Sequence, residues 1–164
     1  GVFYIDGLTA LYEVPFNRAE GAVGDFEAYE GGEHFGIGSD GFVLDCPVGN
    51  ISVSNEWASD GDYSVKVIPT GDGWSHIWSN TAITVSEYNT IEFDIYVDRA
   101  VSGYLFYVYD SNGYHEGKVD LKKGVNHVKY TFNQSFSTYR GIELRAAQAL
   151  TGVYYIDRIV LSKV

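Results

Sequence analysis

The chain has 164 residues, and its 22 acidic and 11 basic side chains give a formal net charge of −11 at pH 7. This charge argues against nucleic acids and anionic membranes as partners, because binding to phosphate needs clustered lysine and arginine side chains. The length fits one domain with a core of its own, and the single cysteine, Cys46, excludes an internal disulfide.

The composition favours β-structure. The chain holds 14 Tyr, 9 Phe, 3 Trp and 19 Gly, but only 3 Pro and no Met. Aromatic residues prefer strands and glycine marks turns, so we expect many short strands joined by turns. No apolar run is long enough to span a bilayer, so we expect no membrane insertion.

The first strand repeats the pattern of the last one. Residues 2–9 match residues 153–160, with Asp6 in register with Asp157. Two explanations stay open. The strand can be the tail of an upstream tandem module or a linker, so that residues 1–15 precede a domain of residues 16–164. Alternatively, both strands belong to one sheet and look alike because both are central and buried.

An acidic, glycine-rich loop follows over residues 17–41. Within it, Asp25 and Glu27 flank Phe26, so the two carboxylates point the same way on an extended backbone. Two carboxylates on one side can chelate a cation. A solvated acidic loop explains the same residues equally well.

Alternating polarity then marks strands over residues 49–55, 63–68 and 74–79. The third of these contains Trp74 and Trp78, four positions apart. On a strand this spacing puts both indoles on one face, about 13 Å apart.

The clearest strand covers residues 90–97, where apolar residues alternate with Glu92, Asp94 and Tyr96. Residues 103–110 are apolar or aromatic on both faces, so this strand is either covered on both sides or presents its tyrosines to a ligand. Strands over 125–132, 142–146 and 153–161 follow. The total of roughly eight to ten strands predicts an all-β fold, an antiparallel β-sandwich or jelly roll with a concave ligand-binding sheet.

The closing strand places Asp157 among apolar neighbours. With a period of two, Val153, Tyr155, Ile159 and Leu161 share its face. An unpaired buried charge costs several kcal/mol or more, in the range of about 3–5. Asp157 therefore needs a cation, a cluster of N–H donors or a metal as its partner.

Nothing in the sequence favours catalysis. No nucleophile triad, phosphate loop or dinucleotide fingerprint occurs, and the four histidines are scattered. Asp157 is the one carboxylate in an apolar setting that would raise its pKa. We therefore expect no enzymatic activity.

Several short motifs follow one another along the chain. They are residues 25–27 (Asp-Phe-Glu), 51–56, 58–67 with a Ser-x-Lys-Val strand, Trp74, and 154–157 (Tyr-Tyr-Ile-Asp). This order resembles the jelly-roll carbohydrate-binding modules appended to secreted polysaccharide-degrading enzymes. These modules belong to the galactose-binding-like β-sandwich superfamily, and the chain is similar to families 4, 16 and 22. The likeness covers about residues 17–164.

The resemblance implies a structural calcium ion. Residues that match the family's calcium ligands are Glu27 and Asp157, with Asp25 and Asp62 as weaker candidates, and backbone carbonyls near residues 60–66 would complete the shell. Calcium takes roughly six to eight hard oxygen ligands. The ion would offset the cost of burying Asp157 and would stabilise rather than catalyse. Asp25 departs from the usual small or polar residue before Phe-Glu.

The resemblance also implies that a sugar lies across the concave sheet with Trp74 as a platform. Outward residues that could share this surface come from several predicted strands: Trp78, Asp94, Tyr96, Tyr107, Tyr109, Glu143 and Arg145. Aromatic rings suit the apolar C–H faces of pyranoses, and polar tips suit the hydroxyls. We expect Trp57 to fill the core instead, whereas for Trp78 core and ligand remain alternatives.

The sequence thus predicts a non-catalytic module that binds a plant cell-wall polysaccharide, namely a β-1,4-linked glucan, mannan or glucomannan, or xylan, in an open cleft. It would hold a catalytic module of the same parent chain near its substrate, outside the cell, as a secreted or cell-surface protein. The alternative is a structural or adhesive β-sandwich of a cell-surface array, and a glycan-active enzyme comes third.

Overall fold

The computed structural model describes residues 22–24, 26, 42–47, 49–145 and 152–164. Within these ranges there are nine strands and no helix. The strands are β1 (Ala22–Gly24), β2 (Phe42–Asp45), β3 (Gly49–Ser54), β4 (Ser64–Pro69), β5 (Trp74–Val97), β6 (Val101–Tyr109), β7 (Tyr114–Leu121), β8 (Gly124–Arg145) and β9 (Tyr154–Ser162). No described helix could cross a membrane. The proposed module boundary at residues 15 and 16 lies outside the described residues.

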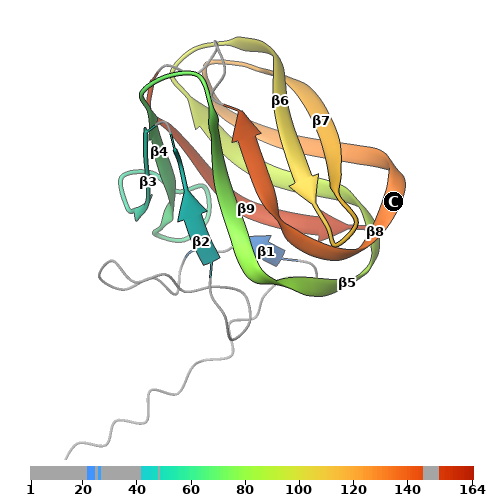
Figure 1. The fold of residues 1–164 in the computed structure, drawn as a ribbon. Helices are drawn as coiled ribbons and strands as arrows, with labels where there is room; N and C mark the ends of the chain where they lie inside the picture. The colour runs from blue at the N-terminus through green and yellow to red at the C-terminus, as the bar shows by residue number, and fades with distance from the viewer. Residues whose placement is uncertain (1–21, 25, 27–41, 48, 146–151) are drawn as a thin grey trace, which may run out of the picture.

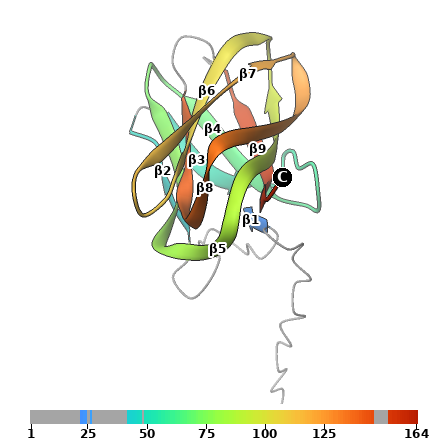
Figure 2. The ribbon, with the colours of Figure 1, turned by 90° about the vertical axis from the view of Figure 1, so that its right-hand side faces the viewer.

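All strand pairs are antiparallel, in the order β3-β4-β9-β5-β8-β6-β7, with β1 on β9 and β2 on β5. The sheet curls into a nearly closed, barrel-like sandwich (Figures 1 and 2). The antiparallel all-β architecture predicted from the alternation of polar and apolar residues is therefore confirmed.

The two longest strands belong to both layers of this sandwich. The start of β5 pairs with β2 and with the end of β8, which in turn pairs with β6. The end of β5 pairs with β9 and with the start of β8. We call β2, β6, β7, the start of β5 and the end of β8 the first layer. The second layer consists of β1, β3, β4, β9, the end of β5 and the start of β8.

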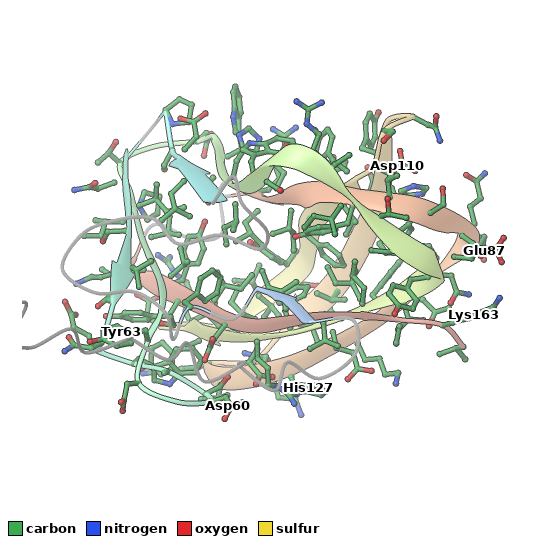
Figure 3. The ribbon with its side chains drawn as sticks, turned by 90° about the horizontal axis from the view of Figure 1, so that it is seen from below. Asp60, Tyr63, Glu87, Asp110, His127 and Lys163 are labelled. Atoms are coloured by element: carbon green, nitrogen blue, oxygen red, sulfur yellow. The ribbon has the colours of Figure 1, made fainter. Side chains whose placement is uncertain are left out.

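The sequence predicts separate strands over 74–79 and 90–97, but the structure joins them in β5. Irregular pairs such as Ile83 with Tyr139 keep β5 and β8 bonded where both bend. Because of this bend, the outward side chains at the start of β5 lie on the outer face of the first layer, and those at its end lie on the outer face of the second layer. Figure 3 shows the two outer faces, with Asp110, directly after β6, and His127 of β8 on opposite sides of the packed side chains.

The core fills the space between the layers. Fully buried side chains include Ile77, Phe93, Phe106, Ile142 and Ile156. The rings of Phe93 and Phe106 meet edge to face at 5.2 Å, a favoured aromatic geometry. The inward assignment of alternate residues along 91–97 is confirmed, since Ile91, Phe93, Ile95 and Val97 are completely buried.

A β-bulge changes the predicted faces of β9. Asp94 pairs with Asp157 but Glu92 pairs with Val160, so β9 contains one extra residue. Arg158 lies in this bulge with φ 50°, a left-handed conformation rare for a residue with a side chain. Tyr154 and Ile156 face the core before the bulge, and Ile159 and Leu161 face it afterwards. Asp157 thus shares its side of the strand with Tyr155 as predicted, but the prediction that Ile159 and Leu161 lie on the same side was wrong.

Candidate functional site

The outer face of the first layer gathers polar and aromatic side chains from four strands. Strand pairing aligns Trp74 with Arg145, His76 with Glu143, and Glu143 with Tyr107. A third row contains Trp78, Gly141, Tyr109 and Tyr114. Because side chains alternate along a strand, these positions share one face. We call it the aromatic face; its members are Trp74, His76, Trp78, Tyr107, Tyr109, Tyr114, Glu143 and Arg145.

The rings of this face form a continuous series of contacts. Ring centroids lie 4.6 Å apart for His76 and Trp78, 4.7 Å for Trp78 and Tyr109, 5.8 Å for Tyr109 and Tyr114, and 5.3 Å for Tyr114 and Tyr107. The Arg145 guanidinium closes the series, 5.3 Å from the Tyr107 ring and 5.8 Å from the Trp74 ring. Cation–π contacts of this kind hold the arginine against both rings.

Glu143 lies at the centre of these contacts and is only 5% exposed. Its Oε2 accepts a 2.8 Å hydrogen bond from the Tyr109 hydroxyl and lies 3.1 Å from Nε2 of His76. Its Oε1 lies 2.9 Å from Nε of Arg145. Burial, followed by the hydrogen bond to Glu143, raises the pKa of Tyr109 to about 12. The phenol is thus a stable donor at neutral pH, and the charge of Glu143 is offset by Arg145.

His76 connects this cluster to β2. Its Nδ1 is buried, lies 3.7 Å from Oδ2 of Asp45, and has no hydrogen-bond partner among the described residues. A carboxylate can only accept, so Nε2 carries the proton that it shares with Glu143. The imidazole is therefore held between two carboxylates and against the Trp78 ring.

Exposure differs across the aromatic face. Tyr114 is 62% exposed on the outer strand β7, and Trp74 is 38% exposed at the opposite corner, whereas Trp78, Tyr107 and Tyr109 are half-buried. Gly141 leaves the room that Trp78 fills, because a Cβ there would lie 2.7 Å from Cε3 of the indole. The two exposed rings are the first that a ligand lying on the surface would meet.

Six of the predicted ligand-binding residues come together on this face: Trp74, Trp78, Tyr107, Tyr109, Glu143 and Arg145. Three further members or neighbours were not predicted, namely His76, Asp45 and Tyr114. Two signals in the sequence could have identified His76 and Tyr114. Counting by two from Trp74 reaches His76, and a hairpin closed by the turn at 110–113 pairs Tyr109 with Tyr114.

Asp94 and Tyr96 do not join this face, contrary to the prediction of one common surface. They lie beyond the bend of β5, so their side chains point outward from the second layer. Tyr96 packs against Tyr155, with ring centroids 6.0 Å apart.

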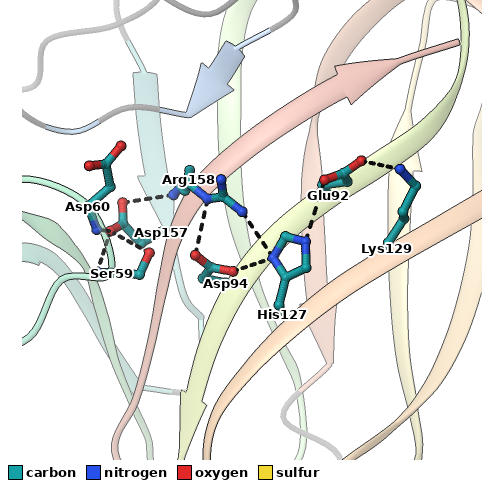
Figure 4. A network of polar contacts seen from close by, with 8 residues as sticks. All are labelled: Ser59, Asp60, Glu92, Asp94, His127, Lys129, Asp157 and Arg158. Carbon is teal, nitrogen blue, oxygen red and sulfur yellow. Dashed lines mark hydrogen bonds and ion pairs between the residues drawn. The ribbon is translucent and has the colours of Figure 1, made fainter.

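Asp94 belongs to a charged network of the second layer (Figure 4). Its Oδ2 accepts a 3.1 Å hydrogen bond from Nε of Arg158, and its Oδ1 lies 2.6 Å from Nδ1 of His127. His127 and Lys129 both contact Glu92. Burial works to raise the pKa of Asp94, but the contacts with His127 and Arg158 outweigh it and hold the pKa below its usual value.

Asp157, the predicted metal ligand of β9, is 2% exposed and is surrounded by N–H and O–H donors. Its Oδ2 accepts from the backbone N–H groups of Ser59 and Asp60 and from the Ser59 hydroxyl, at 2.8–3.1 Å. Its Oδ1 accepts from the Arg158 N–H at 2.7 Å. Burial raises its pKa even so. These donors provide the partner that the sequence required.

The calcium site that the resemblance implies stays a prediction. Asp25 and Glu27 lie outside the described residues, and Asp62 is exposed in the loop before β4. The part of the chain that the structure describes contains no group of three His, Cys, Asp or Glu side chains placed to hold a metal.

No protein-family model and no curated protein matches the sequence. Solved structures with a similar fold do exist. One comes from a study of promiscuous carbohydrate-binding modules of the β-sandwich superfamily, with a TM-score of 0.57 and 15% identity over 90% of this chain. The match spans 64% of that structure, less than two thirds of its length.

Two more similar structures come from Clostridium thermocellum. The family 11 carbohydrate-binding module, in complex with a β-1,3-1,4-mixed-linked tetrasaccharide, has a TM-score of 0.55 and 14% identity, over 89% of this chain and 98% of its own. The C-terminal family 22 module of Xyn10B has a TM-score of 0.53 and 15% identity, over 89% and 96%. The fold of the chain is thus the β-sandwich of carbohydrate-binding modules, as predicted from the sequence motifs.

Proposed function

We propose that this chain is a non-catalytic module that binds a plant cell-wall polysaccharide along the aromatic face. The observation that carries the proposal is the continuous series of rings from Trp74 through Arg145 to Tyr114, arranged around the buried Glu143. The expected ligand is a β-1,4-linked glucan, mannan or glucomannan, or xylan.

The chemistry of the face suits a neutral sugar chain. The apolar C–H face of a pyranose stacks on exposed rings, which Trp74 and Tyr114 supply at the two ends. Polar groups beside these rings, at Asp45 and Arg145, can accept or donate hydrogen bonds to hydroxyls. The Arg145 charge is already balanced by Glu143, so the face has no free cation for an acidic polysaccharide.

Catalysis is a weaker alternative for the same residues. Glycoside hydrolysis needs one carboxyl group that transfers a proton and another that stays ionised near the bond to be cleaved. Glu143 instead has its oxygens engaged by Tyr109, His76 and Arg145. These contacts fit a positioning role in a binding surface.

Attachment to a catalytic module of the same parent chain, an extracellular location and tandem modules are part of this proposal. The family 22 neighbour, named as the C-terminal module of Xyn10B, supports such an arrangement by analogy. A module tethered beside an enzyme raises the effective concentration of substrate. A structural or adhesive role in a cell-surface protein is the competing proposal, because aromatic faces also bind proteins.

A structural calcium ion belongs to the proposal as well. Glu27 and Asp157 would be its main ligands, with Asp25 and Asp62 as further candidates. Calcium would supply a positive charge next to the buried carboxylate of Asp157. A rise in the thermal midpoint of unfolding with calcium, absent in Glu27→Ala, supports the site; identical midpoints with calcium and with a chelator contradict it.

Affinity gel electrophoresis with β-glucan, glucomannan, mannan and xylan tests the main proposal. The wild type should be retarded by one of these polysaccharides, and Trp74→Ala should be retarded clearly less. Ile68→Ala is the matched control, because Ile68 is 39% exposed and lies in β4 of the second layer. If no polysaccharide retards the wild type, sugar binding is wrong and the structural role takes its place; released reducing sugar would indicate an enzyme.

A further inference from the structure

The second layer carries another group of aromatic side chains outside the core. Trp57, on the loop between β3 and β4, lies 5.9 Å from the Tyr96 ring and 6.0 Å from the Tyr155 ring. The two tyrosine rings are 6.0 Å apart. All three are half-buried, and none belongs to the buried core, so the prediction that Trp57 fills the core was wrong. We call these three residues the Trp57 patch.

The loop that carries Trp57 is fixed independently of the indole. Asp157 accepts hydrogen bonds from Ser59 and Asp60, two and three residues further along this loop. The Ser64 hydroxyl donates to the Trp57 carbonyl oxygen. Because polar contacts already hold the backbone, the indole is not needed to attach the loop. A large ring held rigidly at the surface instead suits ligand binding.

Charged groups beside the Trp57 patch neutralise each other. Glu56 accepts a 3.0 Å hydrogen bond from the Tyr155 hydroxyl and forms an ion pair with Lys66. The Lys66 ammonium also lies 6.0 Å from the Tyr155 ring. The patch therefore combines apolar rings with polar groups of no net charge. This combination suits a neutral molecule with apolar faces and hydroxyl groups better than an ion.

We propose that Trp57, Tyr96 and Tyr155 form a second binding surface for a neutral sugar chain. The choice of sugar as the ligand rests on the proposed function; the position of the surface does not. Tyr96, which the sequence marked as a ligand-binding residue, thus binds in the second layer instead of beside Trp74.

The two surfaces point away from each other. The aromatic face uses residues 74–78 of β5, and the Trp57 patch uses Tyr96 beyond the bend of the same strand. One molecule can therefore hold two polysaccharide chains at once. A module with two opposite sugar-binding surfaces cross-links polysaccharide, whereas a module with one surface only coats it.

The test uses the soluble polysaccharide that retards the wild type, and an oligosaccharide derived from it. Calorimetry should find two molar equivalents of oligosaccharide on the wild type, one on Trp57→Ala, one on Trp74→Ala and none on the double variant. Turbidity of polysaccharide mixtures should rise with the wild type and with neither single variant. Thermal unfolding of each variant verifies folding, and Trp57→Phe should keep the second equivalent.

The outcomes separate the two proposals. One equivalent on the wild type, with Trp57→Ala unchanged in affinity and turbidity, overturns the second surface and leaves the aromatic face intact. Loss of all binding in Trp57→Ala, with Trp74→Ala unaffected, overturns the aromatic face and keeps the second surface. A wild-type dimer in sedimentation that Trp57→Ala abolishes, without a second equivalent of sugar, assigns the Trp57 patch to a second copy of the chain and overturns the sugar site.

Discussion

The Tyr109 hydroxyl donates a 2.8 Å hydrogen bond to Oε2 of Glu143, which joins the rings of the aromatic face to its buried charge. The other carboxylate oxygen lies 2.9 Å from Nε of Arg145, and that guanidinium contacts the rings of Trp74 and Tyr107. One carboxylate thus positions side chains from β6 and β8 together. The shape of the aromatic face depends on it.

Glu143→Ala should reduce the free energy of unfolding by about 1–3 kcal/mol, because it leaves buried donors without an acceptor. It should also weaken sugar binding, since Arg145 loses the contact that orients it between Trp74 and Tyr107. Glu143→Gln keeps an acceptor for Tyr109 and should retain more stability. Urea unfolding and gel retardation measure both effects; a Glu143→Ala variant as stable as the wild type would contradict the positioning role.

Tyr114→Ala should leave stability nearly unchanged, because the ring is 62% exposed and contacts only Tyr107 and Tyr109 among the aromatic residues described. Affinity for long chains should fall by roughly two- to tenfold, the equivalent of about 0.5–1.5 kcal/mol for one aromatic contact. Short oligosaccharides that reach only Trp74 should bind as before.

Calorimetry with oligosaccharides of increasing length measures this difference. Tyr114→Phe serves as the control, since it keeps the ring and should keep the affinity. An equal loss for short and long oligosaccharides in Tyr114→Ala would show that Tyr114 acts through its neighbours and not as an outer contact.

The sequence predicts the strands well because polar and apolar residues alternate over most of them. It also places six of the eight predicted ligand-binding residues on one face. It fails for Asp94 and Tyr96 because their strand continues through a bend into the other layer. Alternation identifies which residues share a side of a strand locally, but it carries no information about where a long strand changes layers.

The closing strand illustrates a second limit. The sequence correctly identifies Asp157 as a carboxylate that needs a partner, but it leaves cation, metal and N–H donors as alternatives. The donors come from Ser59 and Asp60, which are almost a hundred positions away, so only the folded loop reveals them. The bulge at Arg158 is equally hidden, since no glycine marks its left-handed conformation.

Buried tyrosines should make the fold sensitive to alkaline pH. Burial raises the pKa of Tyr104, Tyr139 and Tyr154 above the ordinary value of 10, and that of Tyr109 reaches about 12. The native state therefore keeps protons that the unfolded chain releases above pH 10. By linkage, this contribution is complete below about pH 10 and declines as the pH rises through the folded-state values.

The free energy of unfolding, measured with urea at a series of pH values, should thus fall above pH 10. Tyrosinate absorbance should show one group of tyrosines that ionises in the native protein and another that ionises only with unfolding. Tyr139→Phe should reduce the alkaline loss. Complete ionisation of every tyrosine before unfolding would contradict the burial of these hydroxyls.

Asp157→Ala should lower the free energy of unfolding by about 1–3 kcal/mol, because the N–H groups of Ser59 and Asp60 lose their acceptor. The exposed Asp120, which accepts from Ser102 and Gly103, is the control, and Asp120→Ala should cost less. The loop released in Asp157→Ala carries Trp57, so the tryptophan fluorescence should change and any second equivalent of bound sugar should weaken. Retention of that equivalent in a folded Asp157→Ala variant would show that the Trp57 patch holds its geometry without the buried carboxylate.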